Sequence, residues 1–164
     1  MTDLVSSPKW SKVIVGALGA LLVCFTLYTA FFGVFPDGLQ RSFHLLLVML
    51  FVFISALQKP ESRALGKIRA ALMLIAIALA FLTLGHHLIN YDAINARFGA
   101  MTSYEAVFGA ILVVLLFDAS RRTIGWPIII LASLFIAYAL FGRMLPGGIG
   151  HRGYSLERVV SQIY

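Results

Sequence analysis

The chain has 164 residues, of which 60% are hydrophobic and only 12% are charged, and its mean hydropathy is +0.93. A soluble domain is about 45–50% apolar and about 25% charged, so this chain has too few ionic groups to cover a water-facing surface. The composition also excludes an intrinsically disordered chain, and the single cysteine, Cys24, excludes an intrachain disulfide. The net charge of +6 fits the loops of a polytopic membrane protein.

Runs without charged residues mark the predicted membrane spans, because a hydrocarbon core about 30 Å thick needs about 20 apolar residues in a helix. They predict an all-α, polytopic transmembrane helix bundle of four to five spans, forming a single membrane domain over residues 1–164. The spans are expected at residues 13–36, 42–58, 70–91, 100–118 and 123–142, followed by an amphipathic tail helix at 155–164.

The N-terminus is predicted to lie in the cytoplasm. The loop at residues 58–69 carries four basic residues, whereas each of the two loops on the opposite side carries one. Basic residues gather in cytoplasmic loops, where anionic lipid headgroups are their default partners. The first span follows Lys9 and Lys12 and is longer than the roughly 7–15 residues of a signal-peptide core, so we expect an uncleaved signal anchor.

Small residues spaced four apart are candidates for close helix contacts, because helix association in lipid depends on van der Waals packing. Three spans carry such pairs: Gly16 and Ala20, Ala76 and Ala80, and Ala106 and Ala110.

The fourth run, between Glu105 and Asp118, covers only about 18 Å as a helix. It is either a re-entrant or interfacial segment, or a span that recruits the uncharged residues before Glu105, which would then lie near the headgroups. We favour the span, because Asp118 can pair with Arg121 and Arg122 one turn later and so neutralise that end of the helix.

Three histidines near predicted span ends, His44, His86 and His87, raise the question of a haem or metal site. Imidazoles on facing helices can ligate a b-type haem. The alternative is an interfacial imidazole that hydrogen-bonds a loop carbonyl. We favour this alternative, because no second histidine pair and no acidic motif at metal spacing accompanies them. No catalytic, substrate-binding or metal site and no cofactor is predicted.

The middle of each predicted span lacks charged residues and Pro, and no helix break is predicted there. Transporters, pumps and proton channels normally place an ionisable group or a broken helix there. We therefore expect a chain that is not an enzyme and that has no complete translocation pathway of its own.

The tail begins with a helix-stop segment at residues 142–148, GRMLPGG. Ser155 is the expected N-cap of the next helix, with Glu157 in its first turn. One apolar face is expected to contain Leu156, Val159, Val160, Ile163 and Tyr164. The short helix suggests a docking element, or a polypeptide divided at this point.

Five segments carry a resemblance to a known family: RRTIGWP at 121–127, FIAYALFG at 135–142, LPG at 145–147, HRGYSLER at 151–158 and RSFHL at 41–45. They resemble TRAP transporters, and more narrowly the N-terminal part of the fused permease of the TAXI type. The resemblance implies a bacterial inner-membrane symport system for organic acids or amino acids. Its implied partners are a large TRAP permease component, a periplasmic solute-binding protein and membrane lipids, with no nucleic acid.

In that system the chain resembles the small, fixed scaffold component, and the binding residues of the large transport region have no counterpart here. Two alternatives stay open: the small four-helix component of a tripartite tricarboxylate transporter, and a b-haem anchor using His44 with His86 or His87. The structural and interface candidates are Arg41, His44, Asp118, Arg121, Arg122, Gly125, Pro146, Gly147, Ser155, Leu156 and Val159.

Overall fold

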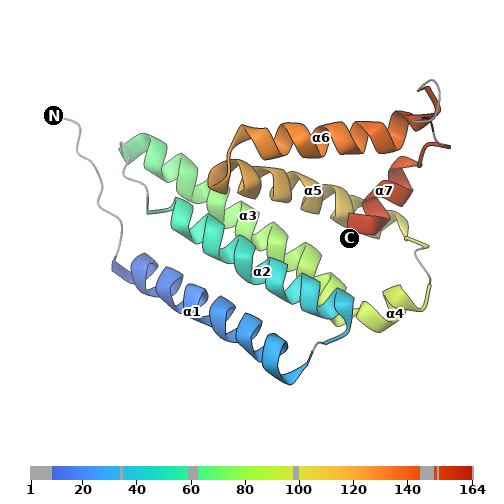
Figure 1. Cartoon of the computed structure of the whole chain (residues 1–164). Helices are drawn as coiled ribbons and strands as arrows, with labels where there is room; N and C mark the ends of the chain where they lie inside the picture. The colour runs from blue at the N-terminus through green and yellow to red at the C-terminus, as the bar shows by residue number, and fades with distance from the viewer. Residues whose placement is uncertain are drawn as a thin grey trace. The chain divides into compact units, whose positions relative to one another are not determined.

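The chain is a polytopic α-helical membrane protein, as predicted. The structure is a computed structural model that describes residues 9–33, 35–58, 63–97, 100–144, 150 and 152–163. These ranges contain helices and no strand, and five of the helices are long and apolar enough to cross a membrane. Contacts between the elements divide the chain into two compact units, Met1–Tyr91 and Asp92–Tyr164 (Figure 1).

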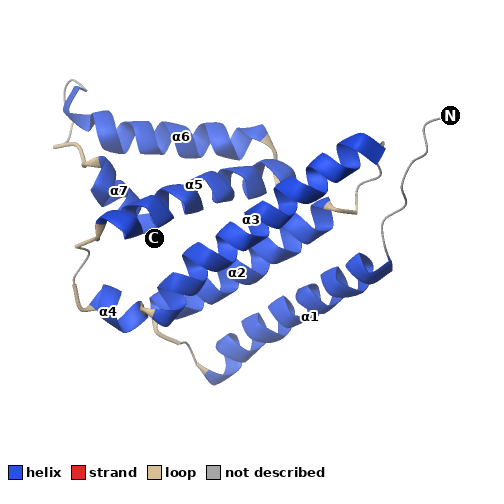
Figure 2. Cartoon of the chain, turned by 180° about the vertical axis from the view of Figure 1, so that it is seen from behind, coloured by secondary structure: helices blue, strands red, loops and turns tan. Residues whose placement is uncertain are grey.

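The first unit contains three antiparallel helices, α1 (Lys9–Phe32), α2 (Asp37–Ala56) and α3 (Arg63–Ile89). Helix α2 lies between the other two and contacts both (Figures 1 and 2). Helix α1 ends earlier than the charge-free run does, because Gly33 adopts a left-handed conformation with φ +105° and Pro36 is already the N-cap of α2. Asp37 then lies in the first turn of α2, where a negative charge is favourable.

The core of the first unit is the contact between α2 and α3. Ala80 is fully buried and Ala76 nearly so, which places this predicted small-residue pair among the packed residues of α3. The buried residues recur at helical spacing on both helices: Leu46, Met49, Leu50 and Phe53 on α2, and Met73, Ala76, Ala80 and Leu84 on α3. By contrast, Gly16, Ala20 and Ala110 are exposed, so the other two predicted pairs do not form buried helix contacts.

The second unit contains the hairpin of α5 (Ser103–Thr123) and α6 (Trp126–Phe141). The short helix α4 (Tyr91–Asn95) lies at the boundary between the units, and the 3-10 turn η1 (Gly142–Met144) follows α6. Helix α7 (Leu156–Ile163) contacts both α5 and α6. One face of α5 is buried along its length, through Glu105, Gly109, Leu112, Leu115 and Ala119.

Helix α5 is continuous and long enough to span a bilayer, which favours the span over the re-entrant segment. Its 21 residues cover about 31 Å at 1.5 Å per residue. The expected recruitment of residues from 100 onwards is only partial, since the helix begins at Ser103. The remaining length comes from the other end, where the helix continues through Asp118 and both arginines to Thr123.

A two-residue turn joins α5 to α6. The backbone N–H groups of Ile124 and Gly125 both donate to the carbonyl oxygen of Ser120, at 2.9 and 3.1 Å. Gly125 has φ +101°, a conformation that side-chain-bearing residues rarely adopt. Helix α6 therefore begins at Trp126 rather than at residue 123, with Pro127 in its first turn, where a missing N–H costs nothing.

Candidate functional site

The first candidate site is the end of unit one where α1 ends, α2 begins and α3 ends. It contains the predicted residues Arg41 and His44 on α2, and His86 and His87 on α3. Two faces of α2 carry different chemistry there: one is closed against α3, and the other opens into a pocket beside α1.

The face toward α3 is sealed by a small buried cluster. The Ser42 hydroxyl and the His87 Nδ1 atom are hydrogen-bonded at 2.9 Å, and both side chains are buried. The His87 ring meets Tyr91 edge-on, with the ring centroids 6.1 Å apart. Tyr91 also lies against Gly38, where an added Cβ would be 2.5 Å from its ring. Gly38 therefore allows the start of α2 to lie close to Tyr91, the first residue of α4.

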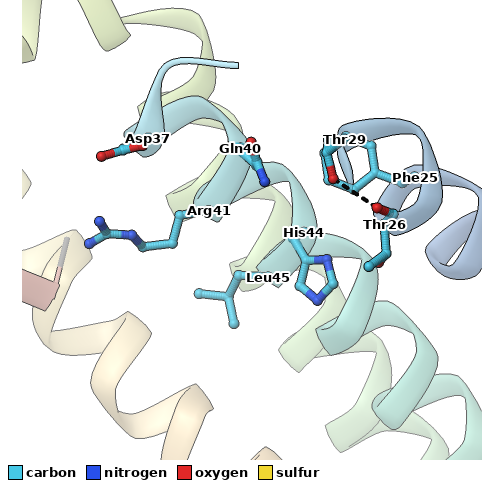
Figure 3. A pocket seen from close by; sticks show the side chains of 8 residues that line it. All are labelled: Phe25, Thr26, Thr29, Asp37, Gln40, Arg41, His44 and Leu45. Carbon is cyan, nitrogen blue, oxygen red and sulfur yellow. Dashed lines mark hydrogen bonds between the residues drawn. The ribbon is translucent and has the colours of Figure 1, made fainter. Parts of the chain in front are cut away.

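The face toward α1 opens into a pocket of about 500 Å³ (Figure 3). His44 and Gln40 lie on the side of α1, whereas Arg41 and Asp37 extend away from it. The pocket is lined by Phe25, Thr26 and Thr29 of α1 and by Asp37, Gln40, Arg41, His44 and Leu45 of α2.

Aromatic rings and threonine hydroxyls define the α1 wall of this pocket. The Phe25 ring packs against Phe43, with centroids 4.9 Å apart, and against His44 at 6.2 Å. The Thr29 hydroxyl donates to the Thr26 carbonyl oxygen at 3.0 Å, and the Thr26 hydroxyl donates to that of Leu22 at 2.8 Å. The threonine hydroxyls are therefore satisfied by their own helix, and the groups left to meet a ligand come from α2.

The rings of His44 and His87 do not converge on a common ligand position. Ser42 and His44 are two residues apart on α2, a rotation of about 200° around the helix. Ser42 binds His87 on the α3 side, whereas the His44 ring lies beside Phe25 of α1. Within the described ranges no group of three or more His, Cys, Asp or Glu residues is arranged to hold a metal ion. The geometry gives a b-haem held by His44 and His87 no support.

The second candidate site is the junction between α5 and α6. The predicted pairing within the last turns of α5 involves Arg122, whose Nε lies 2.7 Å from Asp118 Oδ2. The Arg121 guanidinium instead lies over the Trp126 ring, 5.1 Å from its centroid. With Gly125 in the turn, this helix end holds four of the predicted residues, together with Trp126. Basic and Trp side chains at a helix end suit the membrane interface.

The tail segment before α7 is bound to α6. The Tyr154 N–H donates to the Ala139 carbonyl oxygen at 2.8 Å, and Arg143 Nε donates to the carbonyl oxygen of Arg152. Gly153 has φ +69°, and a Cβ added there would lie 3.2 Å from the Leu140 carbonyl oxygen. These bonds hold residues 152–154 against the end of α6 and the turn η1.

Ser155 caps α7 as predicted from the sequence pattern, because its hydroxyl oxygen accepts the Arg158 N–H at 3.2 Å. The predicted apolar face is only partly packed: Val160 is buried, but Leu156 is 65% exposed. Val159 is half-buried, so among the side chains that the structure describes in α7, those of the predicted face that approach the hairpin lie near the middle of the helix. The candidates Pro146 and Gly147 lie outside the described residues.

The cluster at the start of α5 was not among the sites predicted from the sequence. Glu105 is 1% exposed; it pairs with Arg97 and accepts the Thr102 N–H at 2.7 Å. Glu105 was expected near the headgroups, and neither Arg97 nor the Thr102 N–H was predicted as its partner. A Thr-x-x-Glu pattern before an apolar run is a known signature of a helix start, so part of this cluster was visible in the sequence.

Comparison with known proteins found no matching family model, no matching curated protein and no matching solved structure. The functional assignment therefore depends on the residues and geometry of the chain itself.

Proposed function

We propose that the chain is the non-catalytic small membrane component of a TRAP-type secondary transporter. In this role it acts as a fixed scaffold beside a large permease component. The system would take up organic acids or amino acids through the bacterial inner membrane with a periplasmic solute-binding protein. The N-terminus would lie in the cytoplasm, as the distribution of basic loops predicts.

The observation that carries the proposal is the lack of charge and of breaks inside the candidate spans. Each of the five long helices is continuous over its described length. Their charged residues lie in the first two or last two turns, such as Arg41 in α2, Glu105 and Asp118 in α5, and Arg69 in α3. Substrate and ion sites in transporters usually need discontinuous helices or ionisable groups at mid-depth. A supporting role suits this arrangement better than solute movement.

The exposure of two helices supports a role in assembly. In helices α1 and α6, only 6% of the apolar 18-residue stretch that could cross the membrane is buried within the chain. On α6, Leu134 and Phe135 are 63% and 65% exposed. Such faces require lipid or another membrane helix as a neighbour. A large permease would supply such a helix. The resemblance at residues 121–127, 135–142 and 151–158 lies on this α6-containing unit.

Co-purification from the native membrane in mild detergent tests the proposal. We expect the tagged chain to bring with it a long polytopic permease, and the complex to bind a periplasmic solute-binding protein. Isolation of the chain alone, under conditions that preserve other membrane complexes, would contradict the proposal.

Site-specific photo-crosslinking adds a matched control. A photoreactive residue at Phe135, on the exposed face of α6, should crosslink to the permease in native membranes. The same group at Leu112, which is 1% exposed on α5, should not. Equal crosslinking from both positions would mean that the exposed α6 face is not the contact surface.

A further inference from the structure

Three exposed arginines surround the segment that leads into α7. Arg143 follows α6, Arg152 precedes α7 and Arg158 lies within α7. The Arg143 Nε donates to the Arg152 carbonyl oxygen, and the Arg158 guanidinium lies 5.7 Å from the centroid of the Tyr154 ring. The tail beyond α6 contains one acidic residue, Glu157. This part of the chain therefore presents a surplus of positive charge.

Apolar side chains are exposed beside these arginines. Tyr154 is 53% exposed and Leu156 is 65% exposed. Positive charge and apolar area are thus presented by the same short segment. We define the tail surface as the exposed residues Arg143, Arg152, Tyr154, Leu156 and Arg158.

A backbone bond fixes the depth of the tail surface. The Tyr154 N–H donates to the carbonyl oxygen of Ala139 at 2.8 Å, and Ala139 is two residues before Phe141, the last residue of α6. Two residues of helix rise are only about 3 Å. Helix α7 then contacts both α5 and α6 (Figure 2). The tail surface therefore lies at the level where the candidate span of α6 ends, which is the headgroup layer of a bilayer.

The bias of basic residues toward the cytoplasm does not explain these arginines. Five crossings, an odd number, put the tail on the side opposite the N-terminus and the basic loop at residues 58–69. Cytoplasmic loops are where that bias collects Lys and Arg. No ion pair joins any of the three tail arginines to a carboxylate in the part of the chain that the structure describes. Their partner is therefore to be sought outside the chain.

We propose that the tail surface binds the headgroups of anionic phospholipids in the leaflet where α6 ends. The arginine guanidiniums hold phosphate oxygens, for which their planar donor geometry is suited. The Tyr154 ring lies among the headgroups, and the Leu156 side chain reaches the first methylenes of the acyl chains. This inference does not depend on the transport role.

The depth of the tail surface favours lipid over a soluble protein. An acidic protein surface would also complement the arginines, but it would have to reach the level of the last turns of α6. Lipid is already present at that level, and it covers Leu156 and Tyr154 as well as pairing with the arginines. A zwitterionic headgroup leaves the surplus positive charge uncompensated, whereas an anionic headgroup neutralises it.

Electron paramagnetic resonance of the full chain, in liposomes of equal amounts of dioleoyl phosphatidylcholine and dioleoyl phosphatidylglycerol, tests the depth. A nitroxide at Leu156→Cys, in a Cys24→Ser background, is compared with two reference labels. Leu134→Cys lies on α6 and is 63% exposed, and Asn95→Cys is exposed outside the candidate spans. We expect the Leu156→Cys label to be reached more readily by oxygen than by nickel ethylenediaminediacetate, as for Leu134→Cys. The opposite preference, as for Asn95→Cys, would place the surface in water and overturn the proposal in favour of a soluble acidic partner.

Photo-crosslinking tests the role of the arginines. Phosphatidylglycerol with a diazirine near the carboxyl end of one acyl chain should label the tail peptide more than the matching phosphatidylcholine does. Arg152→Gln and Arg158→Gln should each lower this labelling about fivefold. Lys67→Gln is the matched control, because it removes an exposed positive charge from α3 and should leave labelling of the tail unchanged.

Three results of the crosslinking experiment would overturn the proposal. Equal labelling by the two lipids would remove the preference for anionic headgroups. Unchanged labelling in Arg152→Gln and Arg158→Gln would remove the role of the arginines. Inorganic phosphate should lower the labelling no more than chloride of equal ionic strength, and a larger effect would assign the arginines to free phosphate instead of lipid.

Discussion

Loss of the Glu105 carboxylate should destabilise the second unit more than loss of any exposed charge there. Glu105 has two roles at the start of α5: it accepts the Thr102 N–H at 2.7 Å, and it pairs with Arg97. Arg97 is held in turn by a bond from its Nε to the Ala93 carbonyl oxygen at 3.0 Å. The Glu105 carboxylate therefore links the end of α4 to the first turn of α5.

The magnitude follows from the two bonds. Loss of a helix-start acceptor costs about 1 kcal/mol. A hydrogen bond to a charged group contributes about 1.5–3 kcal/mol. Because the Arg97 side chain is 33% exposed and water can solvate it again, the lower part of that range applies. Glu105→Ala should therefore lower the free energy of unfolding by about 2–3 kcal/mol. Glu105→Gln keeps an acceptor for Thr102 and should cost about 1–2 kcal/mol.

Thermal unfolding in detergent micelles, followed by far-UV circular dichroism, measures the effect. Asp118→Ala is the matched control, because it removes the carboxylate of a pair whose side chains are 29% and 33% exposed. It should cost about 0.5 kcal/mol or less. A double-mutant cycle with Arg97→Gln isolates the coupling between Arg97 and Glu105. If Glu105→Ala is no more destabilising than Asp118→Ala, the reasoning is refuted.

Three further substitutions test other parts of the structure. Gly125→Ala should cost about 1–3 kcal/mol, because an Ala at φ +101° is strained, whereas Gly16→Ala should cost nothing in the same unfolding assay. Ser42→Ala should cost about 1–3 kcal/mol by leaving the buried His87 Nδ1 without its partner; a smaller loss would mean that water replaces the hydroxyl. Ser155→Ala should speed hydrogen exchange in α7 about fivefold, the equivalent of about 1 kcal/mol for a lost cap, and unchanged exchange would contradict the cap.

The five spans were predictable because the hydrocarbon core dictates composition directly. Charge-free runs locate the part of each helix that lies in lipid, but they do not locate the helix ends. Helix α5 continues past Asp118 to Thr123, because arginines at a helix end remain compatible with helical geometry. Conversely, the first run continues beyond α1, because Gly33 and Pro36 are uncharged but end one helix and start the next.

The contacts between distant segments were not predictable. Ser42 and His87 are 45 residues apart, and their hydrogen bond depends on the register between α2 and α3, which hydropathy does not specify. The pocket beside His44 likewise depends on how α1 packs on α2. Only local signals, such as the Ser155 cap and the Thr102–Glu105 pattern, could be interpreted without knowing which helices are neighbours.

The Ile124–Gly125 turn has a consequence for how the chain enters the membrane. A turn of two residues is too short for one helix to insert into the bilayer while the other stays in water. Helix α5 is the least apolar of the five candidate spans, and α6 is more apolar. The two helices should therefore partition into the bilayer together as a hairpin during synthesis, with α6 supplying insertion free energy that α5 lacks. Lengthening the turn would separate these two events, and α5 would then have to insert by itself.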